Sequence, residues 1–325
     1  MFVQKKRWYV ALFLLIFIHG SSLAQLVAEP RGFGVDFDQS MQVSSHYAPW
    51  LAQTNPWWQR VKNLYEQYIV HDEQYSTNPR IPKIVHHIWL GSPFPSLYEK
   101  FRKSWLDHNP DWTFVFWTDN SVNYNKGTVV TVDQLKQILA TQDVRGRTFV
   151  VDLNYHKLYN QVCYSISNNY GERSDIVRYE ALYELGGLYV DTDFECLQPF
   201  DYFHHCLDFY ASVAYTPFSE IFVALIGSAP KHPVIENIVK SLPASYFAYS
   251  DTLSRTGNYH FTRAFSAVGL YGFERVVLFP LTYFYPWPNS SRYENVEKVR
   301  EWIKPESCAI HYWEVSWSKP SAVVR

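Results

Sequence analysis

The stretch from residue 174 to residue 193 constrains the fold more than any other part of the chain. It reads SDIVRYEALYELGGLYVDTD. Ser174 is a suitable N-cap, so we expect a helix from there to Leu185, and Gly186-Gly187 supplies the left-handed conformation that commonly ends a helix. An apolar strand, residues 188–193, is expected to follow at once. A helix that passes directly into a buried strand favours an α/β fold.

The rest of the chain repeats this alternation of helices and strands. Short apolar runs bounded by turn residues predict strands, and longer runs with apolar side chains three and four apart predict helices. We expect strands at residues 81–91, 113–118, 209–215, 221–226 and 276–279, and helices at residues 57–70, 95–108, 132–141 and 232–249. This order favours a mostly parallel central sheet covered by helices.

Two carboxylates stand at the end of the strand that closes this stretch. Side chains alternate along a strand, so Asp191 and Asp193 should point the same way while Thr192 points away. Two convergent carboxylates can hold a hard cation such as Mn²⁺ or Mg²⁺ through oxygen. A lone Asp-x-Asp is common in solvated turns, so the motif alone is weak evidence for a metal site.

A second charged pair lies on the preceding helix. Asp175 and Arg178 are three residues apart and share one helix face. They lie near the helix N-terminus, which favours anionic ligands. The pair could hold a ligand, or it could be an ordinary ion pair worth about 0.3–0.5 kcal/mol.

Composition excludes some classes of protein. Apolar residues make up 47% of the chain and charged residues 18%, which is typical of a globular protein. The net charge is −2 and there is no long Lys/Arg stripe, so no nucleic-acid partner is expected. Cys163, Cys196, Cys206 and Cys308 lack the spacing of a zinc site. They could form one or two disulfides or remain four half-buried thiols.

The first residues have the features of a signal peptide. Lys5, Lys6 and Arg7 precede an apolar run of eleven residues, 8–18, and Ser22-Leu23-Ala24 follows as a small-residue cleavage site. A bilayer span needs about 20 apolar residues, so a cleaved signal is favoured over a type II membrane anchor, which stays open. Either kind of segment would export the chain across a membrane, and an anchor would also keep the chain associated with that membrane.

The central stretch resembles a known family. Its pattern, S-D-x-x-R-x-x-x-L-x-x-x-G-G-x-Y-x-D-x-D, is similar to that of the sugar transferases that contain a DXD motif. These include initiating mannosyltransferases of yeast type and inositolphosphoceramide mannosyltransferases, with the glucosylating domain of large clostridial toxins as a more distant relative. The resemblance covers residues 80–318 and includes IPKIVHHIWLG at 81–91, SWLDHNPDWTFVFWTD at 104–119 and AIHYWEVSW at 309–317.

The resemblance implies a GT-A-type nucleotide-sugar-binding fold and a role for each matching residue. Asp193 would be the main metal ligand, and Asp191 would contact the donor and help to hold the metal. Asp175 and Arg178 would bind donor hydroxyl groups, and Trp89 would line the nucleotide pocket. Two residues would close the site near the metal and diphosphate, namely His311 and Trp317.

The implied activity is transfer of a hexose with retention of configuration. The donor would be a UDP- or GDP-hexose carrying mannose, glucose or galactose, the cofactor Mn²⁺ or Mg²⁺, and the acceptor a glycan, glycolipid or protein. The chain would then divide into a signal peptide or anchor at 1–24, a stem or accessory helical segment at 25–80, a catalytic domain at 81–318 and a tail at 319–325.

Some features depart from the family or leave alternatives. Thr256-Gly257-Asn258 stands where the family often has Thr-Gly-Pro, so the acceptor is open. At most one residue of the His86-His87 pair should reach the site, and His204-His205 should be exposed polar residues. Glu195 is expected to be solvated rather than close to a metal. Two rival functions are a non-catalytic nucleotide- or glycan-binding protein on the same fold and a nucleotide-sugar hydrolase.

Overall fold

The fold is built around one large mixed sheet. The computed structural model describes residues 33–70, 75–214, 220–268, 272–293 and 296–314. The eight strands of the sheet lie in the order β3-β4-β2-β1-β5-β8-β7-β9. Their bounds are β1 Ile84–Ile88, β2 Thr113–Thr118, β3 Thr128–Val130, β4 Thr148–Asp152, β5 Gly187–Val190, β7 Phe209–Val213, β8 Ile221–Ser228 and β9 Val276–Phe279. A separate ladder pairs β6, Phe194–Cys196, with β10, Ala309–His311.

Most neighbouring strands of the large sheet run parallel. The exceptions are the pairings of β8 with β5 and with β7, which are antiparallel. The predicted strand at 113–118 and the one at 276–279 coincide with β2 and β9. The prediction of an α/β fold with a mostly parallel sheet is therefore confirmed.

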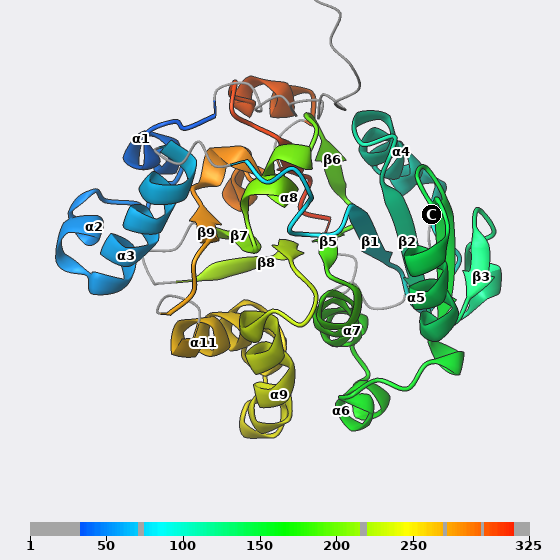
Figure 1. Cartoon of the computed structure of the whole chain (residues 1–325). Helices are drawn as coiled ribbons and strands as arrows, with labels where there is room; N and C mark the ends of the chain where they lie inside the picture. Colours follow the sequence, from blue (N-terminus) through cyan, green and yellow to red (C-terminus); the bar gives the residue numbers. More distant parts are fainter. Residues whose placement is uncertain (1–32, 71–74, 215–219, 269–271, 294–295, 315–325) are drawn as a thin grey trace, which may run out of the picture.

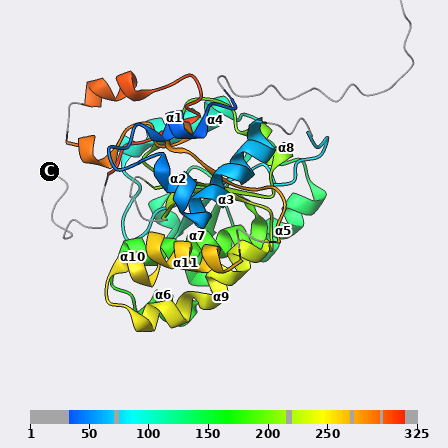
Figure 2. The ribbon, with the colours of Figure 1, turned by 90° about the vertical axis from the view of Figure 1, so that its left-hand side faces the viewer.

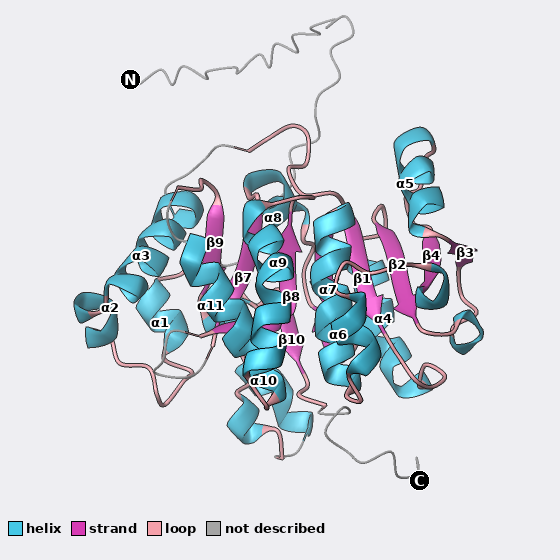
Figure 3. Cartoon of the chain, turned by 90° about the horizontal axis from the view of Figure 1, so that it is seen from below, coloured by secondary structure: helices cyan, strands magenta, loops and turns pink. Residues whose placement is uncertain are grey.

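Helices cover the sheet, as predicted. Figure 1 shows α7, α9 and α11 on one face of the sheet and α4 and α8 on the other, and Figure 3 shows α6, α7, α9 and α11 in front of the strands. The α-helices are α1 Phe37–Met41, α2 Trp50–Thr54, α3 Pro56–Tyr65, α4 Glu99–His108, α5 Val132–Thr141, α6 Gln161–Ile166, α7 Tyr170–Leu185, α8 Asp201–Cys206, α9 Pro233–Ala248, α10 Thr252–Arg255 and α11 Asn258–Val268. Short 3₁₀ segments lie at Ser96–Tyr98, Ser121–Asn123, Leu153–Tyr155, Leu281–Tyr283, Asn289–Ser291 and Val296–Trp302, and a π-helical turn, Glu66–Val70, extends α3.

The strand order reverses at β1. From β1 the chain passes to β2 on one side, while β5 pairs with β1 on the other side. In open α/β sheets, ligands bind at the carboxyl ends of the strands where the order reverses in this way. The end of β5, which leads into Asp191, lies at this edge.

Two details of the central stretch differ from the prediction. Asn169, not Ser174, caps α7, because its side chain accepts hydrogen bonds from the backbone N–H groups of Gly171 and Glu172. The helix therefore begins at Tyr170, and its cap lies five residues earlier than predicted. Strand β5 ends at Val190, so Asp191 and Asp193 lie in a turn rather than on the strand.

The N-terminal described segment packs against the same core as the sheet. Asn55 caps α3 and Pro56 is its first residue, as predicted. Tyr65 of α3 is fully buried, and its hydroxyl group lies 2.6 Å from the carbonyl oxygen of Val35 and 2.9 Å from the hydroxyl oxygen of Tyr283. Figure 2 shows α2 and α3 across the edge of the sheet that faces the viewer. The division of the chain at residue 80 stays a prediction.

Several polar residues are more buried than the sequence suggested. His204 and His205 are not exposed, and this prediction was wrong. The ring of His204 hydrogen-bonds the carbonyl oxygen of Ile81 at 3.1 Å, and that of His205 the carbonyl oxygen of Ser76 at 2.7 Å. These distant backbone partners make burial of the imidazoles tolerable. All four cysteines are buried free thiols.

The predicted signal peptide, residues 1–24, lies outside the described residues. Within the part of the chain that the structure describes, no helix is both long enough and apolar enough to cross a bilayer.

The first glycine of β5 generates a prediction about stability. Gly187 has φ of +105°, and a Cβ there would lie 2.6 Å from the carbonyl oxygen of Ile84. We expect Gly187→Ala to lower the free energy of unfolding by more than the about 1–2 kcal/mol that a left-handed alanine alone costs, because the backbone of β1 must also shift. Urea unfolding monitored by circular dichroism measures this.

Gly272→Ala is the matched control. Gly272 has φ of +84°, but a Cβ added there would meet no heavy atom within 4 Å, so this variant isolates the conformational cost. Equal losses of unfolding free energy in the two variants would contradict a steric role for Gly187.

Candidate active site

The Asp-Thr-Asp motif forms the turn that joins the two sheets. The backbone N–H of Asp191 donates to the carbonyl oxygen of Ala224 at 2.9 Å, and the N–H of Phe194 donates to the carbonyl oxygen of Asp191 at 3.2 Å. The alternation argument for the two carboxylates was therefore wrong in its premise. They converge instead because the turn folds back and β10 pairs beside it, with His311 opposite Phe194.

The C-terminal described segment holds Asp193 from three sides. The Nε2 atom of His311 lies 3.1 Å from Asp193 Oδ1, and the backbone N–H of Glu314 donates to Oδ2 at 2.7 Å. The N–H of Tyr312 donates to the carbonyl oxygen of Asp193 at 3.1 Å. Trp313 adopts a left-handed φ of +57°, which is uncommon for a side chain of this size. The local strain is concentrated at the residue between the two contacts on the carboxylate.

Asp191, Asp193 and His311 have the composition and spacing of a metal site. One ligand atom from each residue lies within 4.8 Å of the other two. Two carboxylates and an imidazole suit a divalent cation, and three protein ligands leave coordination positions for water and phosphate oxygens. The Nδ1 atom of His311 is buried and has no hydrogen-bond partner among the described residues. The residues present thus fit a divalent cation.

Arg178 connects the two parts of the predicted site. Its Nη2 atom lies 3.0 Å from Asp175 Oδ1 and 3.5 Å from Asp191 Oδ1. Its Nη1 atom donates to the carbonyl oxygen of Val223 at 2.9 Å, and the guanidinium lies 4.4 Å from the centre of the Tyr189 ring. Both Arg178 and Asp175 are only 5% exposed. This is a buried bridge from α7 to the DXD turn, so it differs from the surface ion pair that was the alternative.

The buried network shifts the titration of its members. Burial raises the pKa of Asp191; the charge of Arg178 opposes this, and the charge of Asp193 adds to it. Burial also raises the pKa of Asp175 to about 6, against the opposing effects of Arg178 and of the Thr256 hydrogen bond. Although burial opposes its charge, the pKa of Arg178 is raised by Tyr189, Asp175 and Asp191. Arg178 therefore remains charged.

Two residues of this network were not predicted. Tyr189 donates its hydroxyl hydrogen to Asp191 Oδ1. It stands two residues before Asp191, so its nearness in the sequence could have indicated it. Thr256 donates its hydroxyl to Asp175 Oδ2 at 2.7 Å, and its carbonyl oxygen accepts from the hydroxyl of Tyr179 at 2.7 Å. The loop that departs from the family pattern is thus bonded directly to α7.

Trp89 lies beside the site rather than in contact with the carboxylates. It follows β1, its ring centroid is 5.3 Å from that of Tyr98, and its indole N–H donates to Ser92 at 3.1 Å. The pKa of Tyr98 is raised to about 12, first by burial and then by the charges of Glu314 and Asp193. Tyr98, which the sequence did not single out, is therefore in contact with Trp89 and close enough to Asp193 to be affected by its charge. Trp317 lies outside the described residues.

The remaining polar residues of the region are held by the protein itself. His86 accepts from the indole N–H of Trp117 at 3.1 Å, and its Nε2 atom lies 2.7 Å from the carbonyl oxygen of Gly186. Burial lowers the pKa of His86 to about 4, so it is a neutral core histidine. Glu195 forms an ion pair with Arg300 at 2.6 Å and accepts from the hydroxyl of Tyr312 at 2.6 Å.

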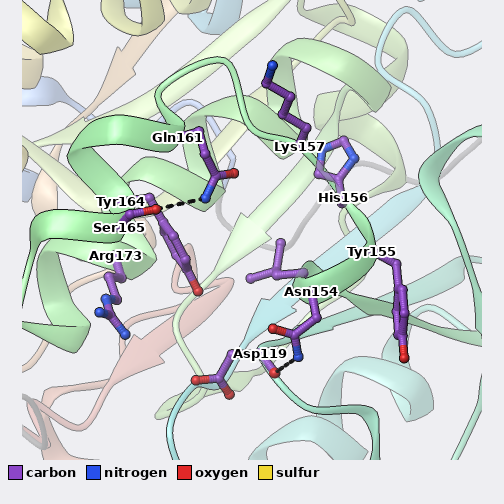
Figure 4. Close-up of a pocket in the computed structure, with 10 residues that line it drawn as sticks. Asp119, Asn154, Tyr155, His156, Lys157, Gln161, Tyr164, Ser165 and Arg173 are labelled. Atoms are coloured by element: carbon purple, nitrogen blue, oxygen red, sulfur yellow. Dashed lines mark hydrogen bonds between the residues drawn. The ribbon is translucent and has the colours of Figure 1, made fainter.

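A pocket of about 780 Å³ opens at the same edge of the sheet. Figure 4 shows Asp119 and Asn154, which follow β2 and β4, on one side of it, and Tyr164 and Arg173 of α6 and α7 on another. Asp119 also accepts a hydrogen bond from the backbone N–H of Gly91 at 2.9 Å, which links the pocket to the loop after β1. The wall of this pocket is therefore polar and aromatic.

The buried state of Asp175 predicts a pH dependence of stability. Its folded pKa of about 6 exceeds the ordinary aspartate pKa of 3.8, so between these values the folded state binds more protons than the unfolded state. The free energy of unfolding of the wild type, minus that of Asp175→Asn, should fall by about 2–3 kcal/mol as the pH rises from about 4 to about 6. Urea unfolding at each pH measures it, and a pH-independent difference would contradict the assignment.

Comparison with known proteins gives a family match. Residues 95–209 match the family model described as a glycosyltransferase sugar-binding region containing a DXD motif. Inositol phosphoceramide mannosyltransferase 3 of Schizosaccharomyces pombe is 30% identical over 179 residues, which cover 55% of this chain and 42% of that protein. Mannosyl phosphorylinositol ceramide synthase CSH1 of Saccharomyces cerevisiae is 27% identical over 188 residues, covering 56% and 42%. The chain thus spans less than half of each relative.

A solved structure titled PaToxG Glycosyltransferase aligns with a TM-score of 0.47 and 18% identity over 66% of this chain and 76% of that one. The matched family region runs from the turn before α4 to the start of β7, and it contains Asp175, Arg178, Asp191 and Asp193. Residues 95–209 of this chain are therefore similar to the DXD-containing sugar-binding region of glycosyltransferases.

Proposed function

We propose that the protein is a metal-dependent glycosyltransferase of GT-A type that moves a hexose from a nucleotide-sugar donor with retention of configuration. One observation carries this proposal. Two aspartates and a histidine place ligand atoms within 4.8 Å of one another where the strand order of a mostly parallel sheet reverses, and both aspartates lie in the region that matches a glycosyltransferase family. This is the edge at which such sheets bind ligands.

The residues of the site would have two roles, binding the cation and orienting its carboxylate ligands. Asp193, Asp191 and His311 would hold the cation. A divalent cation bound there would neutralise the charge that develops on the diphosphate leaving group. The contacts on both oxygens of Asp193 preset its orientation, so little reorganisation is needed when the donor binds. Arg178 and Tyr189 orient Asp191 in the same way.

The donor would lie along the carboxyl edge of the sheet. Its sugar would contact Asp175 and Asp191, and its nucleoside would extend past Trp89 toward the pocket beside Asp119 and Asn154. Neighbouring strands lie about 4.8 Å apart, so the three steps from β5 to β4 cover about 14 Å. An extended donor therefore runs across the strands from the metal site to the pocket.

Mannose is the first candidate sugar because the named yeast relatives are mannosyltransferases. Those names also make a lipid-linked acceptor the first candidate, before a free glycan or a protein. Residues 1–24 would export the chain to a compartment where donor and acceptor meet, whether that segment is cleaved or stays as an anchor.

Transfer is distinguished from its two rivals by product analysis. We expect one of a panel of UDP- and GDP-hexoses to be consumed with Mn²⁺ and to yield a glycosylated lipid, glycan or protein of increased mass. A binding protein would bind a donor without consuming it. A hydrolase would release free sugar at the same rate with every acceptor, and either of these results would contradict the proposal.

The metal site generates a mutational prediction. Asp193→Asn keeps an acceptor for the Glu314 N–H but removes the charge, so turnover should fall by about a hundredfold or more, as for loss of other strong electrostatic contacts in active sites. Activity of the wild type should disappear in EDTA and return with Mn²⁺. Mn²⁺ should also raise the melting temperature of the wild type and leave that of Asp193→Asn unchanged.

Glu195→Gln provides the control for this experiment. Glu195 is a nearby carboxylate that is paired with Arg300 and Tyr312 and is not part of the ligand set. The Glu195→Gln variant should keep most of the wild-type activity and the response of the melting temperature to Mn²⁺. Full activity in EDTA would remove the metal from the mechanism.

A further inference from the structure

The edge of the protein that carries the site also carries an unusual set of exposed apolar side chains. We call this set the aromatic rim. The exposed fractions are Tyr155 77%, Tyr159 67%, Val162 65%, Ile166 50%, Phe247 67% and Tyr249 43%. Single exposed apolar residues are ordinary, but a group confined to one part of a surface commonly marks an interaction site.

The topology brings the members of the rim together. Strand β4 ends at Asp152, and the segment with Tyr155, Tyr159 and α6 follows at the carboxyl edge of the parallel strands. Strand β8 runs opposite to β5, so α9 starts at the far edge and ends near the carboxyl edge, where Phe247 and Tyr249 lie. Figures 2 and 3 place α6 and α10 at the same end of the helix layer.

Hydrogen bonds fix the rim in position. The side chain of Asn160, just before α6, donates to the carbonyl oxygen of Val239 on α9 at 3.0 Å. Just after α6, the side chain of Asn169 lies 3.3 Å from the hydroxyl oxygen of Thr252 on α10. Val162 and Ile166 are four residues apart and share the face of α6 that points to solvent. The apolar side chains are therefore held outward by a helix that is fixed at both ends.

The charge around the rim differs in sign from that of the whole chain. The rim segments, residues 154–173 and 244–263, carry the cations Lys157, Arg173, Arg255 and Arg263 against Glu172 and Asp251, whereas the chain has a net charge of −2. Glu172 is buried and lies 3.5 Å from Arg255. Asp251 caps α10 through the N–H of Ser254 at 2.8 Å. The surface that remains is aromatic, aliphatic and basic, and at its border Tyr155, Lys157 and Arg173 also line the pocket beside Asp119.

We propose that the aromatic rim docks on an anionic phospholipid surface. Tyrosine and phenylalanine side chains flanked by Lys and Arg are the composition of segments that enter the membrane interface, and basic residues near such a surface are attracted to anionic lipids. Docking on this edge would present the Asp191–Asp193 turn to the headgroup layer. That last step rests on the proposed function, because it makes the acceptor a lipid.

The test compares vesicle binding by variants of the full chain. The rim variant is Ile166→Ser with Phe247→Ser, and the matched control is Trp50→Ser with Val129→Ser, two residues that are 59% and 55% exposed on α2 and β3. Each protein is sedimented with vesicles of phosphatidylcholine alone and of phosphatidylcholine with phosphatidylserine. The wild type and the control should bind the anionic vesicles, less at high salt, and the rim variant should bind about tenfold or more weakly.

Other results would overturn the proposal. Equal binding by wild type and rim variant would place the membrane contact elsewhere in the chain, and no binding by the wild type would exclude it. Binding to neutral vesicles that does not respond to salt would remove the anionic partner. A change from dimer to monomer in the rim variant, without vesicle binding by the wild type, would assign the rim to contacts between copies of the chain.

Hydrolysis of the donor in solution separates this proposal from the proposed function. The substituted rim residues touch no member of the metal site, so donor hydrolysis by the rim variant should equal that of the wild type. If the rim variant loses vesicle binding but no variant consumes any donor, the docking surface stands and the transferase proposal fails.

Discussion

The buried guanidinium of Arg178 is the interaction on which the rest of the site depends. It connects three elements of the fold: Asp175 on its own helix α7, Asp191 after β5 and the carbonyl oxygen of Val223 on β8. A charge that is 5% exposed is tolerated only when it is paired and hydrogen-bonded, and removing one partner of such a buried group typically costs about 3–5 kcal/mol. This side chain thus connects the helix, the strand and the DXD turn, together with the backbone hydrogen bond from Asp191 to Ala224.

Much of the fold could be predicted from local sequence patterns. The helix at 132–141 and the strands at 113–118 and 276–279 were predicted to the residue, because apolar periodicity and turn residues define them locally. The start of α7 was missed because Asn169 and Ser174 are both good caps, and the pattern does not choose between them. The burial of His204 and His205 was missed because their partners, Ile81 and Ser76, are more than a hundred residues away in sequence.

The candidate site shows the same division between local and long-range information. Asp175, Arg178 and Asp191 occur in one continuous string, so their spacing in the sequence is enough to predict that they lie near one another. The pairing of β10 with β6, which brings His311 to Asp193, joins segments separated by more than a hundred residues, and it was reached only through family resemblance. Thr256 was noted only as part of the loop where the family often has Thr-Gly-Pro, and Tyr98 had no distinctive pattern. The proximity of both residues to the site follows only from tertiary packing.

The charges of the site are compatible with the proposed cation and the proposed diphosphate leaving group. Asp191 and Asp193 bring two carboxylates to one turn, while the guanidinium of Arg178 is shared between Asp191 and Asp175. Protonation of Asp175, whose pKa is about 6, would leave Arg178 to balance Asp191 alone, and Asp193 would keep His311 as its neighbour. At neutral pH the carboxylates of Asp175 and Asp191 both pair with the one guanidinium of Arg178, so the turn keeps an excess of negative charge. A divalent cation would neutralise that excess of negative charge. Because the turn would neutralise only part of the charge of the cation, the cation would still attract a diphosphate.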